Sequence, residues 1–433
     1  MSERIDGADR YSRVDLDDGG EALAREVAEG TRGLHQLPRE LDPLMAAAVR
    51  RRAMELRAER AGATLSLEHI GSFSLDAQRA STQHCENFAG VAQVPLGLVG
   101  PLRVLGEHEQ GDVVVPLATT EGALLASVNR GCRAIQAAGG ARVRVEDVGM
   151  TRAPAFRTSG LEEVGRLLEW VESHFDRMRE HAGKTSRFLD LQEVRPKVLG
   201  TTVFLRFRFL TGDAMGMNMA TIACDRLVSE LIEPETGVQC VALSGNYCVD
   251  KKPAAVNFEL GRGKRIWAEV ELPREVLERI LKTRSEMLVE VQLRKNLHGS
   301  IAAGAMGYNA QFANVLAALF VATGQDLAHV VEGAMGLTHF EQRSDGAVYA
   351  SVYLPDAPVA AVGGGTGLDT QRESLQLLGI RPDAENPGRA ARRLAEIVGA
   401  TVLAGELSLM SAFTSRDLAR AHERLGRGPS ERP

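Results

Sequence analysis

The chain contains little of what marks secreted, metal-binding or membrane proteins. It has five cysteines in 433 residues, an odd number without a CxxC pair, which indicates reduced thiols rather than a disulfide framework or a zinc site. None of its ten histidines belongs to an HExxH motif, so we expect no metal. The longest apolar run, VLAALFVA at 315–322, is far shorter than the ~20 residues of a membrane-spanning helix.

A basic excess is also lacking. The formal net charge is −6, and the arginines are interleaved with acids, which argues against a groove for nucleic acid. The first residues are acidic and polar, without the apolar core of a signal peptide. With 44% hydrophobic and 25% charged residues, the composition predicts a soluble, cytoplasmic globular protein with no nucleic-acid or membrane partner.

The length of 433 residues predicts two or three domains. Residues 1–85 are rich in helix formers, and 38–60 has the apolar spacing of an amphipathic helix, whereas 10–20 looks loosely ordered. Glycine and proline at 86–103 indicate short strands and tight turns.

A strand at 112–118 runs into Thr119-Thr120-Glu121-Gly122. Either threonine would cap a following helix, with Glu121 near its first turn. Leu124, Val128 and Ile135 share one face of that helix.

The middle of the chain has a different pattern. A helix at 161–182, β-like runs at 203–210 and 238–249, and a helix at 214–232 predict a β-α-β-type insert of about 90 residues over 154–242. The elements expected after the insert are a strand at 264–271, helices at 275–293 and 300–323, a turn at 363–367, a long helix at 386–412 and a final helix at 415–425. The helix at 386–412 is apolar on too many sides for a surface helix, so it should be buried.

Taken singly, the motifs have plain structural interpretations beside functional ones. GGGT at 363–366 is not GxGxxG and is more typical of a turn than of a nucleotide site. Glu121 would complement a helix dipole, and Asp250-Lys251-Lys252 is typical of a solvated turn. Three further side chains are equally explained as a helix cap or as surface residues: Asp326, Arg152 and His422.

The order of the motifs is far more specific than any one of them. Together they closely resemble the 3-hydroxy-3-methylglutaryl-CoA reductase family, class I type, over roughly 85–427. The segments that carry the resemblance are ENFAGVAQVPLGLVGPL, TTEGALLASVNRGCRAI, GMTRAP, GDAMGMNMAT, SGNYCVDKKPAAVNF, GYNAQFANV, ATGQD, AVGGGTGL and NPGRAARRLAEIVGATVLAGELSLM.

The resemblance implies the roles of four catalytic residues. Glu121 matches the catalytic glutamate, Lys251 the catalytic lysine, and Asp326 the aspartate that links them, while His422 matches the histidine that protonates the CoA thiolate. By the same matching, the hydroxymethylglutaryl group is held by Arg152, Ser244, Asp250, Lys252 and Asn314. The NADPH site is lined by Ser186, Arg187, Asp213, Met215, Gly216, Met217, Asn218, Gly363, Gly364, Gly365 and Thr366, with Ser186-Arg187 at the 2′-phosphate.

The resemblance also implies the organisation of the chain, an α+β fold. The N-terminal helical domain covers 1–85, and the large HMG-CoA-binding domain, built around a central helix, covers 86–153 and 243–427. A small, ferredoxin-like NADP-binding domain is inserted at 154–242, and 428–433 forms a flexible tail. The active sites would be shared between the subunits of a homodimer, with a homotetramer as the alternative.

The reaction explains these residue types. A thioester carbonyl that accepts hydride becomes an oxyanion, and a buried ammonium such as Lys251 would stabilise it by roughly 3–4 kcal/mol. An imidazolium with a pKa of about 6.5 can protonate a thiolate with a pKa of about 8.5. The aldehyde that forms needs a second hydride and a proton, for which a carboxyl group such as Glu121 with a pKa raised by burial is suited.

The chain departs from the family pattern at several places. Glu423 follows His422 where an apolar residue is usual, Leu210 replaces a basic residue, and Gln311 stands where histidine is frequent. Gly428 stands where eukaryotic members carry a phosphorylatable serine.

Two alternatives stay open. One is an NAD-dependent enzyme that oxidises mevalonate or a paralogue with another acyl-CoA, and Ser186-Arg187 speaks against the first of these. The other is a non-catalytic CoA-binding paralogue, which would be expected to lack at least one member of the complete set Glu121, Lys251, Asp326 and His422.

Overall fold

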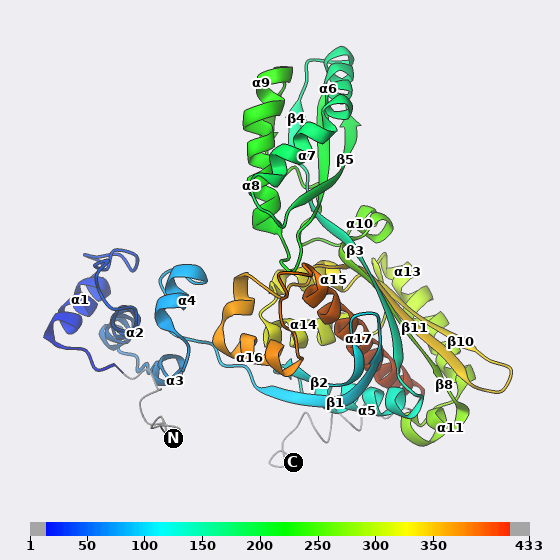
Figure 1. Cartoon of the computed structure of the whole chain (residues 1–433). Helices are drawn as coiled ribbons and strands as arrows, with labels where there is room; N and C mark the ends of the chain where they lie inside the picture. The colour runs from blue at the N-terminus through cyan, green and yellow to red at the C-terminus, as the bar shows by residue number, and fades with distance from the viewer. Residues whose placement is uncertain (1–13, 416–433) are drawn as a thin grey trace. The chain divides into compact units, whose positions relative to one another are not determined.

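A computed structural model of the chain describes residues 14–415 and divides into two compact units (Figure 1). The first unit comprises Met1–Pro95 with Gly367–Glu373, and the second comprises Leu96–Thr366 with Ser374–Pro433. We describe each unit by itself.

The first unit is helical. Its two main helices are α1 (Asp18–Glu29) and α2 (Pro43–Arg60). The Asp42 side chain accepts hydrogen bonds from two backbone N–H groups at the start of α2, and Pro43 at the first position needs no such bond. The helix predicted at 38–60 therefore begins five residues later, and α1 occupies part of the stretch expected to be loose. Two short helices follow, α3 (Glu68–Gly71) and α4 (Ala77–Gln83).

The second unit is built on a mixed sheet. Its hydrogen-bonded path runs β7-β4-β6-β3-β8-β11-β10-β9, with β1 on β2 and β3, and β5 on β6. Strand β3 (Ala141–Arg152) joins its two halves, because residues 142–149 pair with β8 and residues 150–152 pair with β6. The other strands are β1 (Leu96–Leu105), β2 (Gln110–Ala118), β4 (Ala155–Arg157), β5 (Asp190–Leu199), β6 (Thr202–Leu210), β7 (Gln239–Ala242), β8 (Arg262–Leu272), β9 (Gly307–Tyr308), β10 (Gly336–Gln342) and β11 (Val348–Ala357).

The larger core of this unit surrounds α17 (Arg389–Ser415), which packs against α5 (Leu124–Ala137), α14 (Phe312–Thr323) and strands β3, β8 and β11. The segment Arg389–Thr414 is long and apolar enough to cross a membrane, yet 83% of its most apolar window is buried inside the protein. The prediction of a buried helix is confirmed, because the apolar residues on every side find partners.

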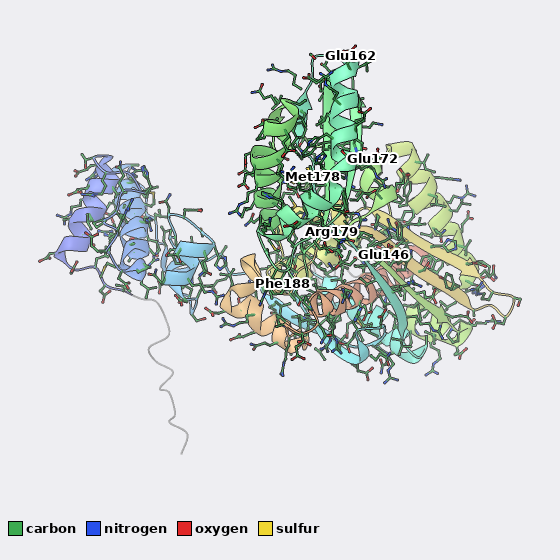
Figure 2. The ribbon with its side chains drawn as sticks, turned by 45° about the horizontal axis from the view of Figure 1, so that its top comes forward. Glu146, Glu162, Glu172, Met178, Arg179 and Phe188 are labelled. Carbon is green, nitrogen blue, oxygen red and sulfur yellow. The ribbon has the colours of Figure 1, made fainter. Side chains whose placement is uncertain are left out.

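A second hydrophobic core is formed by residues from Phe156 to Val238 of the sequence. It lies among β4, β5, β6, α6 (Leu161–Ser173), α7 (Phe175–Gly183) and α8 (Met217–Leu227). Alternate residues of β6, from Val203 to Phe209, are fully buried there. Figure 2 labels Met178 within this layer, whereas Glu162 and Glu172 lie on its outside, in agreement with their burial.

Several predicted helices are broken. The helix expected at 300–323 ends at Ala303, where Gly304 turns left-handed, and Gly307–Tyr308 pair with β10 before α14 begins. The helix expected at 275–293 breaks at Lys282, which has φ +59°. Of the β-like run 238–249, only Gln239–Ala242 is a strand.

The remaining segments are short and mostly connect these elements. They are α9 (Glu233–Thr236), α10 (Ala255–Leu260), α11 (Arg274–Val276), α12 (Ser285–Val291), α13 (Ser300–Ala303), α15 (Val330–Gly333), α16 (Asp369–Leu377), the π-helical turns η1 (Val228–Ile232), η2 (Leu277–Leu281) and η3 (Gln292–Gly299), and the 3-10 turns η4 (Leu327–His329) and η5 (Gly364–Gly367). The mixed α+β class predicted from the sequence is confirmed. The final helix predicted at 415–425 lies, apart from its first residue, outside the described residues.

Candidate active site

The loop that carries Lys251 has an unusual backbone. Asn246, Val249 and Lys251 all have positive φ angles, of 63°, 50° and 58°. This region is unfavourable for side chains, above all for a β-branched valine, and each such residue costs about 1–3 kcal/mol. Hydrogen bonds from the side chains of Thr151 and Asn257 to the loop carbonyls of Cys248 and Val249 hold the loop in place. The surroundings therefore impose the direction in which Lys251 points.

Lys251 forms an ion pair with Asp326. Its Nζ lies 2.8 Å from Asp326 Oδ2, and the two side chains are 42% and 35% exposed. The hydrogen bond to Asp326 raises the pKa of Lys251. Burial alone would raise the pKa of Asp326, but the Lys251 ammonium, the neighbouring His329 and a backbone N–H lower it. Both groups are therefore ionised at neutral pH. The sequence analysis expected a buried Lys251, whereas its side chain is 42% exposed.

Asp326 also begins a turn. It follows α14, and its Oδ1 accepts a hydrogen bond from the backbone N–H of Ala328. The cap interpretation from the sequence is therefore correct, and it coexists with the ion pair through the other carboxylate oxygen.

Glu121 lies near a different predicted residue. Its Oε2 accepts a hydrogen bond of 2.8 Å from Asn314 Nδ2, and its side chain is exposed. In the described part of the chain it makes no ion pair with Lys251 and no hydrogen bond with Asp326. The predicted threonine cap is wrong, because α5 begins at Leu124 after the left-handed Ala123, and the Thr119 hydroxyl accepts from the Glu121 N–H instead.

The predicted substrate residues form small groups. Arg152, at the end of β3, donates to Ser244 Oγ over 3.0 Å and to Thr221 Oγ1 over 2.7 Å. Lys252 is exposed and donates to the backbone carbonyl of Asp250. The structure thus brings Arg152 together with Ser244, and Asn314 together with Glu121.

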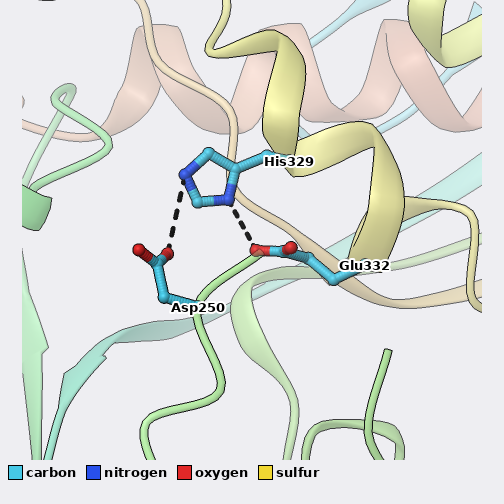
Figure 3. A group of neighbouring side chains, drawn as sticks. All are labelled: Asp250, His329 and Glu332. Atoms are coloured by element: carbon cyan, nitrogen blue, oxygen red, sulfur yellow. Dashed lines mark hydrogen bonds and ion pairs between the residues drawn. The ribbon is translucent and has the colours of Figure 1, made fainter. Parts of the chain in front are cut away.

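A buried charged group, which the sequence analysis missed, lies beside Lys251. We call it the Arg262 cluster: Arg262, Asp250, His329 and Glu332. The Arg262 guanidinium donates to Asp250 Oδ1 over 2.6 Å and to Glu332 Oε1 over 2.7 Å, and it is fully buried. Figure 3 shows His329 between Asp250 and Glu332, with Nδ1 2.5 Å from Glu332 Oε1.

Asp250, His329 and Glu332 have the chemistry of metal ligands, and their ligand atoms lie within 4.8 Å of one another. Arg262, however, already bonds both carboxylates, so a cation is already present among them. The H-x-x-E spacing of His329 and Glu332 one turn after Asp326 was a usable signal, because residues three apart share a helical face. Arg262 comes from a distant strand and had no local signal.

An outer layer surrounds this cluster. Asp356 on β11 accepts a hydrogen bond of 2.8 Å from Asn257, which in turn accepts one from Arg206. Burial raises the pKa of Asp356 to about 8. Burial and the nearby Arg262 charge lower the pKa of Arg206.

The two segments predicted to bind NADPH lie side by side. Ala214 forms a parallel bridge with Val362, and the Ala361 N–H donates to the Asp213 carbonyl. The Asp213 side chain is buried and accepts from the Ala391 N–H near the start of α17. The segment 213–218 and the segment 363–366 are therefore neighbours in space, as one ligand site would require.

Residues 363–366 also press against the segment before Asp326. A Cβ atom on Gly324 would clash with the carbonyl oxygen of Gly365, so glycine is required at this close approach. Gly363 and Gly364 have positive φ angles, and no atom lies within 4 Å of where their Cβ atoms would stand. The loop is thus open at Gly363 and Gly364, whereas Gly365 is packed against Gly324.

Ser186 and Arg187 lie in the second unit, before β5. The Arg187 guanidinium stacks on the exposed Phe188 ring, 4.6 Å from its centre, and Ser186 Oγ accepts from the Phe188 N–H. The predicted catalytic histidine, His422, lies outside the described residues.

Known proteins resemble this chain over most of its length. A sequence model of the family Hydroxymethylglutaryl-coenzyme A reductase matches residues 46–427. The 3-hydroxy-3-methylglutaryl-coenzyme A reductase of Methanothermobacter thermautotrophicus is 50% identical over 408 residues, which is 94% of this chain and 100% of that protein. The enzyme of the same name from Pyrococcus abyssi is 45% identical over 94% of this chain and 99% of that protein.

Solved structures show the same fold. A class II 3-hydroxy-3-methylglutaryl-CoA reductase from Streptococcus pneumoniae, bound to NADPH in open conformations, has a TM-score of 0.61 at 21% identity, covering 76% of this chain and 78% of that one. Another structure of the reductase from Streptococcus pneumoniae has a TM-score of 0.62 at 21% identity and covers 76% of each chain. The family match over most of the sequence, the full-length relatives and the shared fold lead to one conclusion: this chain belongs to the hydroxymethylglutaryl-coenzyme A reductase family.

Proposed function

We propose that this chain reduces (S)-3-hydroxy-3-methylglutaryl-CoA to (R)-mevalonate and CoA with two NADPH, as a class I enzyme. Membership of the family makes it an oxidoreductase of the mevalonate route to isoprenoids. The observation that carries the proposal is the ion pair of Lys251 and Asp326, which presents an ammonium from a strained loop. The identity of only 21% to the class II structure speaks against class II.

In this proposal Lys251 stabilises the charge that develops on the substrate oxygen. When the thioester carbonyl accepts hydride, the carbonyl oxygen becomes an oxyanion, and the ammonium of Lys251 binds it. The carbon–sulfur bond then breaks, the oxygen becomes the carbonyl of an aldehyde, and the thiolate leaves with the electron pair. His422 gives that thiolate its proton.

Glu121 supplies the proton of the second half-reaction. The aldehyde accepts a second hydride on carbon, and its oxygen takes a proton from the Glu121 carboxyl to become the alcohol. Glu121 is exposed in the single chain, so a second subunit would have to cover it to keep water out of the site. This supports a homodimer with shared active sites, or a homotetramer, in which a second subunit covers Glu121.

The substrate's charged end requires cations and hydrogen-bond donors. Arg152 with its partner Ser244, and the exposed Lys252, supply them for the carboxylate, and Asn314, which donates to Glu121, offers a further amide donor. Asp250 is held by Arg262 and would accept from the substrate hydroxyl.

The cofactor supplies hydride when bound. The open front of the loop Gly363–Thr366, beside Asp213, Met215, Gly216, Met217 and Asn218, leaves room for backbone N–H groups to meet a ligand. Ser186 and the exposed Arg187 offer a hydroxyl and a guanidinium for a 2′-phosphate, which supports NADPH over NADH.

The proposal includes the organisation of the chain. The N-terminal domain covers 1–85, the HMG-CoA domain covers 86–153 and 243–427 around α17, and a ferredoxin-like NADP domain covers 154–242. The separate hydrophobic core between Phe156 and Val238 supports the inserted domain. We propose a cytoplasmic enzyme without a membrane partner, which the buried α17 supports.

The experiment is an assay at 340 nm with the hydroxymethylglutaryl thioester, run with NADPH and with NADH on wild type and Lys251→Ala. We expect two NADPH oxidised per CoA released, and loss of this activity in the variant. Faster turnover with NADH would instead favour an enzyme that oxidises mevalonate. Binding of the thioester without oxidation of either cofactor would contradict the proposal.

A further inference from the structure

Arg262, the first residue of β8, is fully buried and has partners in three separate segments. Its Nη1 donates to Glu332 Oε1 over 2.7 Å, and its Nη2 donates to Asp250 Oδ1 over 2.6 Å. The same Nη2 lies 3.0 Å from Met217 Sδ and donates to this weaker acceptor as well. Because a buried guanidinium without partners is strongly disfavoured, these contacts determine the position of the side chain.

Two of these partners belong to the sites proposed for two different ligands. Asp250 precedes Lys251 in the loop proposed to bind the hydroxymethylglutaryl group. Met217 is the first residue of α8 and lies in the segment 213–218 proposed to bind the cofactor. Glu332, on α15, is fully buried and belongs to neither site. Arg262 therefore contacts both proposed ligand sites while Glu332 anchors it in the core.

A single nitrogen atom makes both connections. Nη2 carries two N–H groups, and their directions are fixed in the plane of the guanidinium. One points to Asp250 and the other to Met217. When Met217 is displaced, the guanidinium turns about its bond to Glu332, and the N–H that points to Asp250 turns with it. A movement in the cofactor segment is thus transmitted to the substrate loop through one planar group.

The orientation of the Asp250 carboxylate depends on this contact. Arg262 binds Oδ1, whereas within residues 14–415 no hydrogen bond is made to Oδ2. The backbone on either side is constrained, because Val249 and Lys251 both have positive φ angles. Since the two oxygens of a carboxylate lie in one plane, fixing Oδ1 also fixes the direction of Oδ2. That second oxygen is left for the hydroxyl group of the substrate.

We propose that Arg262 is a positioning residue that couples the two ligand sites: a cofactor on the segment 213–218 fixes Met217, and Arg262 then presents Asp250 to the substrate hydroxyl. Arg262 touches no reacting atom, and this role rests on the functions proposed for Asp250 and for the segment 213–218. The junction has to be ordered only once, so the ligand that binds second is spared that entropic cost. Coupling of this kind is reciprocal, so each ligand strengthens the binding of the other by the same factor.

The test measures binding rather than turnover. Isothermal titration calorimetry on the full chain gives the Kd of hydroxymethylglutaryl-CoA without cofactor and with saturating NADP⁺, which has no hydride to transfer. The ratio of the two Kd values is the coupling factor. For wild type we expect a factor of about five or more, at the lower end of the usual range for coupled sites. A variant that loses affinity equally in both measurements keeps its coupling factor, so a merely structural role for Arg262 leaves the factor unchanged.

Two variants interrupt the junction at different points. Met217→Leu removes the sulfur acceptor and nearly conserves the side-chain volume, so α8 should fold as before. Arg262→Lys keeps the charge but loses the planar fork that reaches three partners. We expect a coupling factor below about two in both variants. Met219→Leu is the matched control, because it is the same substitution on the same helix and its side chain packs against the second hydrophobic core. It should keep the wild-type factor.

The outcomes separate this inference from the proposed function. A factor near one in wild type, an unchanged factor in Met217→Leu, or a lost factor in Met219→Leu overturns the role of Arg262. Met217→Leu decides the matter if Arg262→Lys does not fold, because it leaves the buried charge in place. A wild type that binds neither hydroxymethylglutaryl-CoA nor NADP⁺ contradicts the proposed function as well, whereas binding of both ligands with a factor near one contradicts this inference alone.

Discussion

Two groups of buried carboxylates in the second unit are stabilised in opposite ways. The α17 glutamates, Glu396 and Glu406, are held by polar groups that come from neighbouring loops and strands. Glu396 accepts from the backbone N–H groups of residues 107–109. Glu406 accepts from the N–H groups of Ala310 and Gln311 and from the Thr338 hydroxyl.

The Arg262 cluster is held by side chains, and it is incompletely paired. Buried atoms without a hydrogen-bond partner in the described chain include His329 Nε2, Glu332 Oε2 and Arg262 Nε, and Asp356 Oδ1 in the layer behind them. Backbone donors cannot move without moving the fold, whereas side chains can exchange partners. The comparison shows that the α17 glutamates fix loops onto the core, whereas the side chains of the Arg262 cluster can still exchange hydrogen-bond partners beside Lys251.

The largest effect should come from removing a carboxylate of the first kind. Glu406→Ala leaves the buried N–H group of Gln311 and the partly buried one of Ala310 without an acceptor, and we expect a loss of roughly 3–6 kcal/mol in the free energy of unfolding. Thr401→Val on the same helix is the control, because within residues 14–415 its hydroxyl bonds only the Ile397 carbonyl one turn earlier. Denaturant unfolding of both variants checks this. Equal losses would mean that Glu406 does not brace the loop.

Asp326→Asn should have the opposite effect: a large loss of activity with little loss of stability. Lys251 loses its ionised partner, so kcat should fall about a hundredfold. The thermal midpoint should stay near wild type, because partly exposed ion pairs contribute only about 0–1 kcal/mol. Asp112→Asn, which breaks the exposed pair with Arg103, is the control and should change neither quantity. A large loss of stability in Asp326→Asn would mean that the pair of Lys251 and Asp326 stabilises the fold, as the α17 glutamates do.

Asp356→Asn should stabilise the protein as pH rises. Burial raises the pKa of Asp356 from 3.8 to about 8, so between these values the folded chain holds a proton that the unfolded chain releases. Rising pH therefore destabilises wild type through this group, and the neutral asparagine removes that loss. We expect a gain of roughly 5 kcal/mol at pH 8, from about 1.4 kcal/mol for each unit by which the pKa is raised, and this gain vanishes near pH 4. Unfolding at several pH values measures it, and a constant difference would contradict the assignment.

The smallest effect concerns the proposed cofactor loop. Gly363 has φ +83°, and an alanine there meets no atom but strains the backbone by about 1 kcal/mol. We expect a higher KM for NADPH and an unchanged KM for the thioester. Gly165→Ala is the control, because it lies in open space within α6 and favours the helix. A higher KM for the thioester alone would remove Gly363 from the cofactor site.

The sequence predicted well the elements whose pattern is determined locally. The apolar residues around α17 required burial, and the alternation in β6 required a strand with one face inside. The same reasoning failed at Lys282 and Gly304, where a single left-handed residue interrupts an otherwise helical pattern. Nothing in the residues around Lys282 marks the break there, whereas Gly304 is a helix-stop signal that the sequence prediction passed over. After Gly304, β9 pairs with a strand that comes later in the chain, which the sequence pattern does not show.

The residues of the candidate site could be predicted only where they lie within sequence motifs that resemble the family. Lys251 and Asp326 were named, and the structure pairs them. Arg262 was not, because it joins Asp250 and Glu332 across the fold and a lone arginine at the start of a strand carries no signal. The partial exposure of Lys251 and Glu121 could not be predicted either, since burial depends on the whole assembly of elements.

The contact between Gly324 and Gly365 has a practical meaning for anyone who redesigns this protein. The backbones touch with no side chain between them to absorb a displacement, and Asp326 stands only two residues from Gly324. A loop transplanted from a relative into 363–366 would therefore press directly on the peptide that carries the aspartate. Because the two segments are in direct backbone contact, a loop exchange should replace 324–326 and 363–366 together.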